Sequence, residues 1–470
     1  MNRLNLLFVI RYLLFDLRFT IYGSRFTVHG VYEMKSFTIT TLGCKVNRYE
    51  SEAISEQLQN RGWRLTDKEA MADLCIINTC TVTGKAAMQS RQATRKVIRN
   101  HPGAFVMVTG CYAQIAPEVF SSMPGVHCVV GNAFKDQIPR LISRHKDHGP
   151  AMTLIEDLSA PRPFQDLPVT RFGNRTRPFL KIQDGCDAFC AYCIIPHARG
   201  RSRSLTPKIV MERTRSLKES GYAEAVLCGI NIGRYGQDLT PATSLGRLMQ
   251  LIDTDQGVKR LRLSSIEPTE LSEELIGQLA SSRRICPHLH IPLQSGDDKV
   301  LKGMNRTYSS QFYRDLVHHI INLMPDVSIG VDVLVGFPGE TERAFENTCR
   351  LIERLPIAYL HVFPFSMQRQ TAAAAFRDPV LPEAIKKRCQ HVRSIGEAKR
   401  RKFYEKFIGS TFEVLIEGQR DRATGHLKGL TKNYIPVLVE GDDELMHQVV
   451  QTRLTRIEHC RVFGESLSDQ

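Results

Sequence analysis

Residues 184–204 read DGCDAFCAYCIIPHARGRSRS and place Cys186, Cys190 and Cys193 in a C-x3-C-x2-C run. Three thiolates this close in sequence can hold a metal ion or an iron–sulfur cluster. A closed tetrahedral zinc site and a cubane cluster each need four ligands, and this run supplies three. In a [4Fe–4S] cluster held in this way, one iron would have no protein ligand and could bind a small molecule. We therefore predict that this loop carries the chemistry of the protein.

Length, charge and cysteine content narrow the class of protein. A chain of 470 residues is too long for one ordinary core and indicates about two to four domains. Its 63 basic and 49 acidic residues give a net charge of +14, which favours a polyanionic partner such as nucleic acid. Thirteen cysteines, an odd number in so long a chain, favour reduced thiols in the cytoplasm over a secreted disulfide scaffold.

The first 33 residues are apolar but are interrupted by charges, among them Arg11, Asp16 and Arg18. No apolar run reaches the roughly 18 residues of a membrane helix, and Arg11 splits the apolar core that a signal peptide would need. We expect no membrane association and treat residues 1–33 as an N-terminal extension without a functional motif. Met34 precedes a clean strand pattern, so we hypothesise that translation starts there.

In the next part of the chain, apolar strand-like runs alternate with amphipathic helical runs, which predicts a parallel sheet with helical crossovers. Cys44, Cys80 and Cys111 each come just after one of these strands. Because the carboxyl ends of such strands share one edge of the sheet, the three cysteines could converge there on a second cluster. Cys75 and Cys128 lie inside the apolar runs and are predicted to be core residues.

Six further strand-like runs with helical stretches between them predict an open, partial (β/α)6 barrel. The chemistry of such a barrel lies at the C-terminal ends of its strands, and the cysteine loop follows the first of them. Polar residues that end other strands and would line the same mouth are Asn231, Glu267, Gln294 and Asp332. A structural zinc site with His197 as fourth ligand is the alternative, but it would leave no open position for a reactant.

The C-terminal part begins with a basic helical pattern, since residues 386–406 hold nine basic and two acidic side chains. The rest reads as short strands separated by glycine turns, which predicts a small β-barrel. A basic helix that leads into a small barrel fits RNA binding through the phosphate backbone. A dimerisation or packing domain is the alternative.

Several segments together resemble the radical S-adenosylmethionine (SAM) methylthiotransferases, whose superfamily is marked by C-x3-C-x2-C after a first barrel strand. They are GCKVNRYESEAI, INTCTVT, TGCYAQ, GCDAFCAYCIIPHARGRSRS, LSSIEP, HIPLQSGDD and GVDVLVGFPGET. NIGRYG, LRLSSIEP, HVFPFS and NYIPV are similar to the branch that acts on threonylcarbamoyladenosine in tRNA. The resemblance implies an α/β fold with three parts: a parallel-sheet α/β domain at 34–147, a partial (β/α)6 radical-SAM barrel at 172–402 and a TRAM RNA-binding β-barrel at 405–470.

One motif departs from the family pattern. The last-strand motif S-x-R-x-G-T of the family is represented here by Ser366, Arg369, Gln370 and Thr371, with Gln370 in place of glycine. A turn that requires a positive φ would be strained by glutamine, so we expect an altered loop geometry at this position.

The resemblance implies roles for the cysteines and their neighbours. Cys186, Cys190 and Cys193 would be the catalytic residues, holding a [4Fe–4S] cluster that binds SAM and generates a radical. Further SAM-binding residues would be Tyr192, packed on the adenine, Gly229, where the backbone approaches the ligand, and Asn231, Gln294 and Asp332. Cys44, Cys80 and Cys111 would be the metal ligands of a second [4Fe–4S] cluster, which carries the sulfur.

The implied reaction is methylthiolation of carbon 2 of threonylcarbamoyladenosine beside the tRNA anticodon. The expected partners are the anticodon loop and an electron donor such as flavodoxin or ferredoxin, and the protein is expected to be a cytoplasmic monomer. Within the family, the alternative substrates are isopentenyladenosine in tRNA and an aspartate of a ribosomal protein. Outside it, the alternative is a zinc-bound RNA-binding protein without catalytic activity.

Overall fold

The computed structural model describes residues 35–67, 70–142, 151–173 and 175–467, and the backbone of residues 14–21 and 24–31. β1 (Leu14–Ile21) and β2 (Ser24–Val31) pair as an antiparallel hairpin. Met34, the hypothesised start of translation, lies outside the described residues. Within the described part of the chain, no helix is long and apolar enough to span a membrane.

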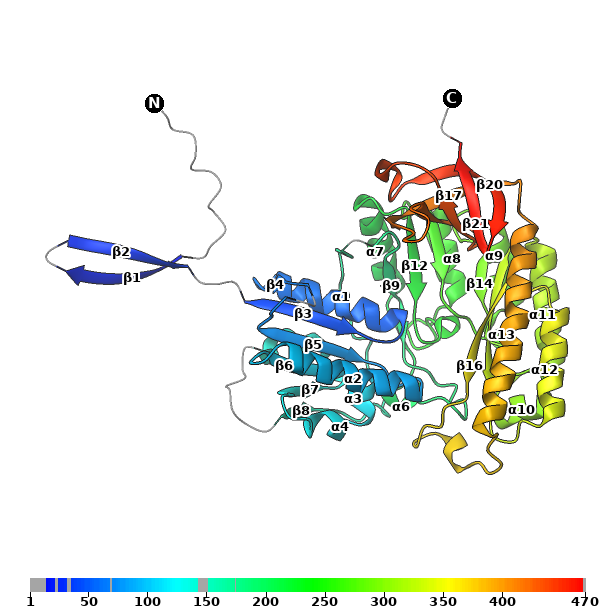
Figure 1. Cartoon of the computed structure of the whole chain (residues 1–470), viewed down its shortest axis with the longest axis horizontal. Helices are drawn as coiled ribbons and strands as arrows, with labels where there is room; N and C mark the ends of the chain where they lie inside the picture. The colour runs from blue at the N-terminus through cyan, green and yellow to red at the C-terminus, as the bar shows by residue number, and fades with distance from the viewer. Residues whose placement is uncertain are drawn as a thin grey trace.

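A six-stranded parallel sheet forms the N-terminal part, with the strand order β4–β3–β5–β6–β7–β8 (Figure 1). Its strands are β3 (Ser36–Thr41), β4 (Arg64–Leu65), β5 (Leu74–Thr79), β6 (Phe105–Gly110), β7 (Cys128–Val130) and β8 (Met152–Leu154). Its helices are α1 (Lys45–Gln59), α2 (Gly84–Asn100), α3 (Cys111–Ile115), α4 (Glu118–Ser121), η1 (Asn132–Gln137) and α5 (Ile138–Leu141). The parallel sheet predicted for this part of the chain is thereby confirmed.

Both faces of this sheet are covered, as the strand sequences require. Alternate residues along a strand point to opposite faces, so fully apolar strands need helices on both sides. Apolar residues of α1 and α5 cover one face, and those of α2, α3 and α4 cover the other. Cys75 and Cys128 are fully buried on opposite faces, which confirms that they are core residues.

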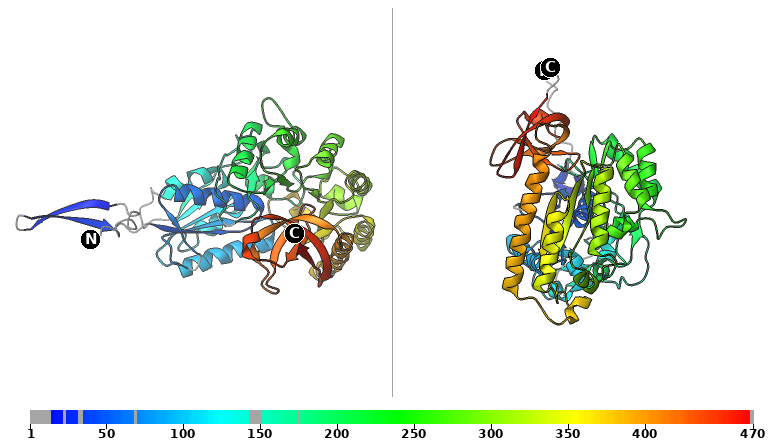
Figure 2. Two further views of the ribbon diagram at one scale, coloured as in Figure 1. Left: turned by 90° about the horizontal axis from the view of Figure 1, so that it is seen from above. Right: turned by 90° about the vertical axis from the view of Figure 1, so that its right-hand side faces the viewer.

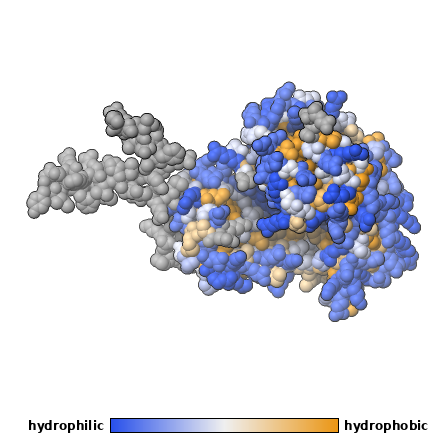
Figure 3. Space-filling view, turned by 45° about the horizontal axis from the view of Figure 1, so that its top comes forward, coloured by the Kyte–Doolittle hydropathy of each residue, from blue (hydrophilic) through white to orange (hydrophobic). Residues whose placement is uncertain are grey.

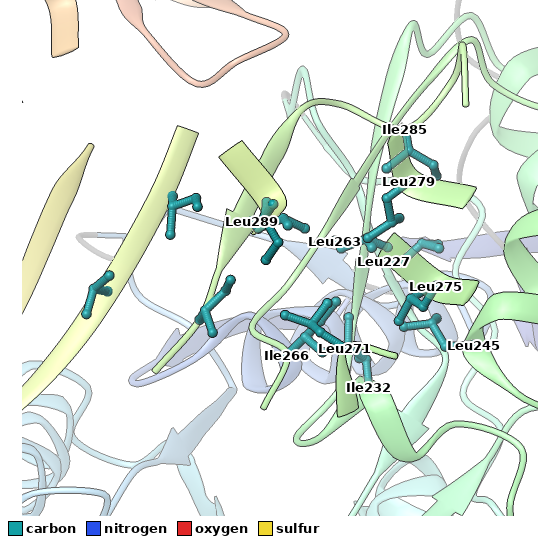
Figure 4. Packing of buried hydrophobic residues seen from close by; sticks show 14 of the residues in the cluster. Leu227, Ile232, Leu245, Leu263, Ile266, Leu271, Leu275, Leu279, Ile285 and Leu289 are labelled. Carbon is teal, nitrogen blue, oxygen red and sulfur yellow. The ribbon is translucent and has the colours of Figure 1, made fainter. Parts of the chain in front are cut away.

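The middle of the chain forms the predicted open barrel of six parallel strands in two sheets, β9–β12–β13 and β14–β15–β16. The strands are β9 (Phe179–Lys181), β12 (Glu224–Cys228), β13 (Arg260–Leu263), β14 (His288–His290), β15 (Ser328–Val335) and β16 (Tyr359–Pro364). The covering helices are α7 (Pro207–Glu219), α8 (Leu245–Thr254), α9 (Glu273–Ser281), α10 (Asp298–Gly303), α11 (Ser310–Leu323) and α12 (Glu342–Arg354). Figure 4 shows leucine and isoleucine side chains of strands and helices meeting in the largest apolar core, which holds this barrel together.

A short antiparallel pair closes the cysteine loop at its base. β10 (Gln183–Asp184) pairs with β11 (Arg203–Ser204), so the intervening residues leave and return at one point of the barrel. Within the loop, α6 (Ile195–Arg199) begins two residues after Cys193 and packs against α3 of the N-terminal part. The loop is therefore held by the barrel and by the N-terminal sheet.

The C-terminal part is a closed five-stranded barrel with the strand order β17–β18–β19–β21–β20. Its strands are β17 (Thr411–Arg420), β18 (Leu427–Thr431), β19 (Pro436–Val439), β20 (Val449–Glu458) and β21 (Arg461–Ser466). The long helix α13 (Pro382–Glu405) runs along β16 up to this small barrel (Figure 2). Arg260 and Arg262 of β13 donate hydrogen bonds to carbonyls of Leu430 and Lys432, and these bonds seat the small barrel on the larger one.

A buried network of charges joins the N-terminal part to the barrel. Glu50 of α1 accepts from Lys135 of the same part, from Lys181 of β9 at 2.9 Å and from Arg199 of α6 at 2.9 Å. Arg199 also reaches Asp184 at 3.0 Å, and all five side chains are almost fully buried. Breaking a buried pair leaves an uncompensated charge in a medium of low dielectric constant, so this network specifies how the two parts dock.

Glu50→Gln should weaken this docking at neutral pH. Burial alone would raise the pKa of Glu50, but Arg199, Lys135 and Lys181 outweigh it and hold that pKa well below its ordinary value of 4.5. The ionised carboxylate therefore stabilises the fold above about pH 4.5, and this contribution is lost as the pH falls toward the native pKa. We expect Gln to cost about 3–5 kcal/mol of unfolding free energy at pH 7, and the cost to shrink as the pH falls below 4.5.

Urea denaturation of the apo protein, followed by circular dichroism between pH 3.5 and 7.5, measures this effect. The matched control is Glu52→Gln, on the same helix, whose carboxylate makes a half-exposed pair with Arg175 at 3.3 Å. That substitution should cost no more than about 1 kcal/mol. Equal costs for the two variants, or a cost for Glu50→Gln that does not change with pH, would contradict the role given to the network.

Candidate active site

The upstream triad, Cys44, Cys80 and Cys111, lies at the carboxyl edge of the N-terminal sheet. The three residues come after β3, β5 and β6, which are neighbours in that sheet. Two glycines allow the close approach of their loops, since both have positive φ, +96° at Gly43 and +97° at Gly110. A Cβ atom on Gly43 would lie 2.8 Å from the Sγ of Cys80, and one on Gly110 would lie 2.4 Å from a backbone oxygen. The structure thus brings the three thiols to one place.

The thiols of the upstream triad influence one another electrostatically. Burial, together with charge on Cys111 and Cys44, raises the pKa of Cys80 to about 12. Nearby positive charge would therefore be needed to hold Cys80 as a thiolate. Cys80 and Cys111 are buried, whereas Cys44 is exposed, so the triad is accessible from one side.

The barrel triad, Cys186, Cys190 and Cys193, lies in the closed loop between β10 and β11. The backbone N–H of Ala188 donates to the Cys186 Sγ at 3.4 Å, and Arg306 Nη1 lies 3.2 Å from the Cys190 Sγ. Burial raises the pKa of Cys186 to about 11 and that of Cys193 to about 12, and charge on Cys190 raises both. These donors would stabilise thiolates, the form in which cysteine binds metals.

His197, the fourth ligand of the zinc alternative, is exposed on α6. Its ring packs edge to face against Phe189, with 6.3 Å between ring centroids. Arg306 was not among the residues predicted from the sequence. Arg306 pairs with Glu267, which was predicted to line the mouth of the barrel. The need of Glu267 for a cationic partner was therefore the signal that could have pointed to Arg306.

Beside Cys186 the structure gathers polar atoms without partners. Asn231 Nδ2 lies 4.0 Å from the Cys186 Sγ and donates to Glu270 at 2.9 Å. Asn231 Oδ1 and Glu270 Oε2 are buried and have no hydrogen-bond partner among the residues that the structure describes. Buried polar atoms are normally paired, so two adjacent free acceptors indicate a place for a donor group such as an ammonium. Glu270, which lies in η4 (Pro268–Glu270), was not predicted from the sequence.

The other predicted SAM-binding residues fall into two groups. Tyr192, Gln294 and Asp332 line one pocket of about 210 Å³ together with the end of β16 and residues just after Cys80. Gly229 lies elsewhere, where its missing side chain makes room for Gln183, whose Oε1 would be 2.7 Å from a Cβ at that position.

Asp332 is also held by two histidines. His290 Nε2 lies 2.8 Å and His361 Nδ1 3.3 Å from the same carboxylate oxygen of Asp332. Burial would raise the pKa of this carboxyl, but the hydrogen bonds and charges of the two histidines hold it far below its ordinary value. Asp332 therefore presents a fixed negative charge at the pocket wall.

The loop after β16 spans the gap between the barrel and the upstream triad. Ser366 Oγ accepts from the backbone N–H of Gly84 at 2.7 Å, and Gln368 donates to the Thr81 carbonyl at 2.8 Å. Gln370 is not among the described residues with positive φ, and its side chain donates to the Ile115 carbonyl at 3.3 Å. The backbone at Gln370 therefore carries no strain from a positive φ, and the side chain serves as a contact to the N-terminal part.

The residues around the upstream triad fit an anionic cluster. Arg199 is fully buried, and within the described part of the chain its Nε–H has no hydrogen-bond partner. Cys111 acts on Arg199 electrostatically. Asn132 joins the same place, since its Nδ2 donates to the Ala198 carbonyl at 2.6 Å and lies 3.9 Å from the Cys111 Sγ. The cations of the docking network outnumber its carboxylates, and a cluster with thiolate ligands would supply the missing negative charge.

Family models match most of the chain in three blocks. The "Uncharacterized protein family UPF0004" model matches residues 36–131, the "Radical SAM superfamily" model 180–352 and the "TRAM domain" model 405–467. Among solved structures, the radical SAM methyltransferase TsrM from Kitasatospora setae, with cobalamin and a [4Fe–4S] cluster bound, is similar with a TM-score of 0.53 and 16% identity. That match covers 73% of this chain and 77% of the other, and it supports the fold alone.

Curated relatives are similar over nearly the whole chain. The threonylcarbamoyladenosine tRNA methylthiotransferase MtaB of Bacillus subtilis (strain 168) is 36% identical, covering 90% of this chain and 94% of the relative. The protein of the same name from Aquifex aeolicus (strain VF5) is 34% identical, with coverages of 86% and 97%. The tRNA-2-methylthio-N(6)-dimethylallyladenosine synthase of Clostridium botulinum (strain Okra / Type B1) is 32% identical, with coverages of 92% and 97%. The chain therefore belongs to the radical SAM methylthiotransferase family.

Proposed function

We propose that this protein transfers a methylthio group to carbon 2 of threonylcarbamoyladenosine beside the anticodon of tRNA, with SAM and two [4Fe–4S] clusters. Relatives with this name at 34–36% identity support the substrate, and the relative that acts on dimethylallyladenosine, at 32%, defines the second candidate. The observation that carries the mechanism is the presence of two cysteine triads in a single docked unit. Most radical SAM enzymes have a single cysteine triad, so the second triad of this protein needs a separate function.

The two triads share their surroundings. Asn132 links Cys111 to the α6 segment of the barrel loop, and Gln368 links the end of β16 to Thr81, next to Cys80. The pocket that holds Tyr192 is lined from the other side by Val82 and Thr83. A substrate in this pocket would therefore contact both parts of the molecule.

At the barrel triad, the protein would bind and orient SAM. The free acceptors of Asn231 and Glu270 would receive its ammonium group, and Arg306 would compensate the negative charge at Cys190. A bound cluster and SAM supply a carbon radical that can remove hydrogen from an unactivated carbon. Tyr192, Gln294 and Asp332 would be further contacts of SAM at the wall of their common pocket, and the docked N-terminal part would exclude water from it.

At the upstream triad, the protein would hold the cluster that carries the sulfur. Arg199 would donate its free Nε–H toward Cys111 and balance the charge of the three thiolates. Cys44, the exposed member, leaves one side of the site open to the substrate. The proposed division of labour is radical generation at one triad and sulfur delivery at the other.

The small barrel and the helix before it would bind the tRNA. We keep the three domains predicted from the sequence, at 34–147, 172–402 and 405–470, as part of this proposal. Several basic residues of α13 have protein partners instead: Arg388 pairs with Glu340 at 2.8 Å, and Lys399 donates to the Leu355 carbonyl at 2.8 Å. Lys386 and Lys387 are exposed and free for phosphates. We also propose that the protein is a monomer served by an electron donor such as flavodoxin or ferredoxin.

Deletion of the gene should abolish one tRNA nucleoside. We expect the methylthio form of threonylcarbamoyladenosine to disappear and its precursor without the methylthio group to accumulate, because this protein would be the one that places sulfur on carbon 2. Mass spectrometry of digested tRNA measures both, and complementation with the wild-type chain should restore the product. If methylthio-isopentenyladenosine were lost instead, the substrate proposed here would be replaced by the second candidate.

The two triads should lose iron independently. Cys186→Ala/Cys190→Ala/Cys193→Ala should retain roughly half of the iron and sulfide of the reconstituted wild type, because the upstream thiols still hold a cluster. Cys44→Ala/Cys80→Ala/Cys111→Ala should give the complementary half. Iron and acid-labile sulfide assays measure this, with Cys75→Ala/Cys128→Ala as the core control that keeps both clusters. A barrel-triad variant without residual iron, or a wild type that holds zinc without sulfide, would refute the two-cluster proposal.

A further inference from the structure

A second cavity, of about 530 Å³, lies where α1, the segment before β9, the barrel strands and the small barrel meet. Figure 3 shows a hydrophilic recess between the N-terminal part and the small barrel. Its charged lining residues are Lys45, Arg48, Arg175, Arg177, Arg262 and Glu417. Cationic side chains from three separate parts of the chain thus face one carboxylate.

The ion pairs around the cavity do not neutralise all of its cationic side chains. Arg177 pairs with Glu417 at 2.7 Å, and Arg175 pairs with Glu52 at 3.3 Å. Arg262 pairs with Glu224 at 2.9 Å and is tied to the carbonyls of the small barrel.

Lys45 and Arg48 remain, and neither forms an ion pair with any carboxylate of the described residues. A concave site with unpaired cations concentrates positive potential and attracts an anion.

Aromatic rings make up another wall of the cavity. His288 of β14 stacks on Tyr434 of the small barrel with 4.0 Å between ring centroids, and the Arg262 guanidinium lies 5.0 Å from the centroid of Tyr434. Arg175 lies 5.0 Å over Phe179. Cations interleaved with aromatic faces are typical of sites that hold single-stranded nucleic acid. The anion that fits this cavity is therefore part of an RNA.

The cavity borders the site of sulfur delivery. Lys45 directly follows Cys44, so the start of α1 belongs both to the upstream triad and to the cavity wall. In adenine, carbon 2 and carbon 6, which carries the N6 nitrogen, flank the same ring nitrogen on one edge of the base. If carbon 2 of an adenine faces the upstream triad, the N6 substituent of that adenine lies on the same side of the base and thus close to the start of α1, which also lines the cavity.

We propose that this cavity binds the carboxylate of the threonylcarbamoyl group, with Lys45 and Arg48 as the residues that select it. This inference rests on the proposed substrate. The isopentenyl group of the second candidate has no charge and would leave the two cations unpaired, so the cavity discriminates between the two modified adenosines by charge. The other anion that RNA could offer is a backbone phosphate of a neighbouring nucleotide.

Binding of three anticodon stem-loops to the cluster-loaded enzyme separates these sources. The stem-loops carry threonylcarbamoyladenosine, isopentenyladenosine or unmodified adenosine at the same position, and affinity is measured anaerobically by fluorescence anisotropy. Arg48→Gln should weaken binding of the threonylcarbamoyl RNA by about tenfold and leave the other two nearly unchanged. Arg48→Glu should reverse the preference. Arg61→Gln, just past the end of the same helix, is the matched control and should change none of them.

Two results for Arg48→Gln would contradict a carboxylate site. Equal weakening of all three RNAs by Arg48→Gln, with a shallower salt dependence, would overturn the carboxylate assignment in favour of a phosphate. Unchanged affinity for all three would overturn the anion site altogether. Iron content of each variant, which should equal that of the wild type, excludes damage to the clusters. Failure of the proposed substrate itself is distinguishable, because the wild type would then show no preference for the threonylcarbamoyl RNA.

Discussion

The placement of both cysteine triads depends on the buried pairing of Glu50 with Arg199. Glu50 belongs to the helix that starts directly after Cys44, and Arg199 ends the helix that follows Cys193. The pair therefore ties a segment beside one triad directly to a segment beside the other. A buried, multiply bonded ion pair fixes the separation of the two triads more strictly than apolar packing alone, because displaced charges cannot find new partners. A fixed separation is what the proposed transfer between them would need.

The same pairing links structure to the chemistry of the upstream triad. The network contains Lys135, Lys181, Arg199 and Arg203 against the carboxylates of Glu50 and Asp184, which leaves positive charge in excess. Excess charge in a buried place is costly unless an anion lies near it. Three thiolates and their cluster would be such an anion, and a filled site would then neutralise the excess charge of the docked fold.

The local elements and the positions of the cysteines could be predicted from the sequence. Buried parallel strands read as short apolar runs, and cysteines directly after such runs must lie at one edge of the sheet, as Cys80 and Cys111 do. The partners of these residues could not be predicted, because they join distant segments. Nothing local in the sequence shows that Arg199 pairs with Glu50, or that Glu270 leaves a free acceptor beside Asn231.

Position 370 shows that tertiary contacts help to decide the conformation of a loop. Glycine in the family pattern suggests a turn that only glycine tolerates, yet the chain here avoids that conformation and extends the Gln370 side chain to the Ile115 carbonyl. The loop gains a hydrogen bond to the N-terminal part in addition to those of Ser366 and Gln368. These three bonds tie the loop after β16 to the N-terminal part, so the barrel is joined to that part here as well as through the Glu50–Arg199 pair.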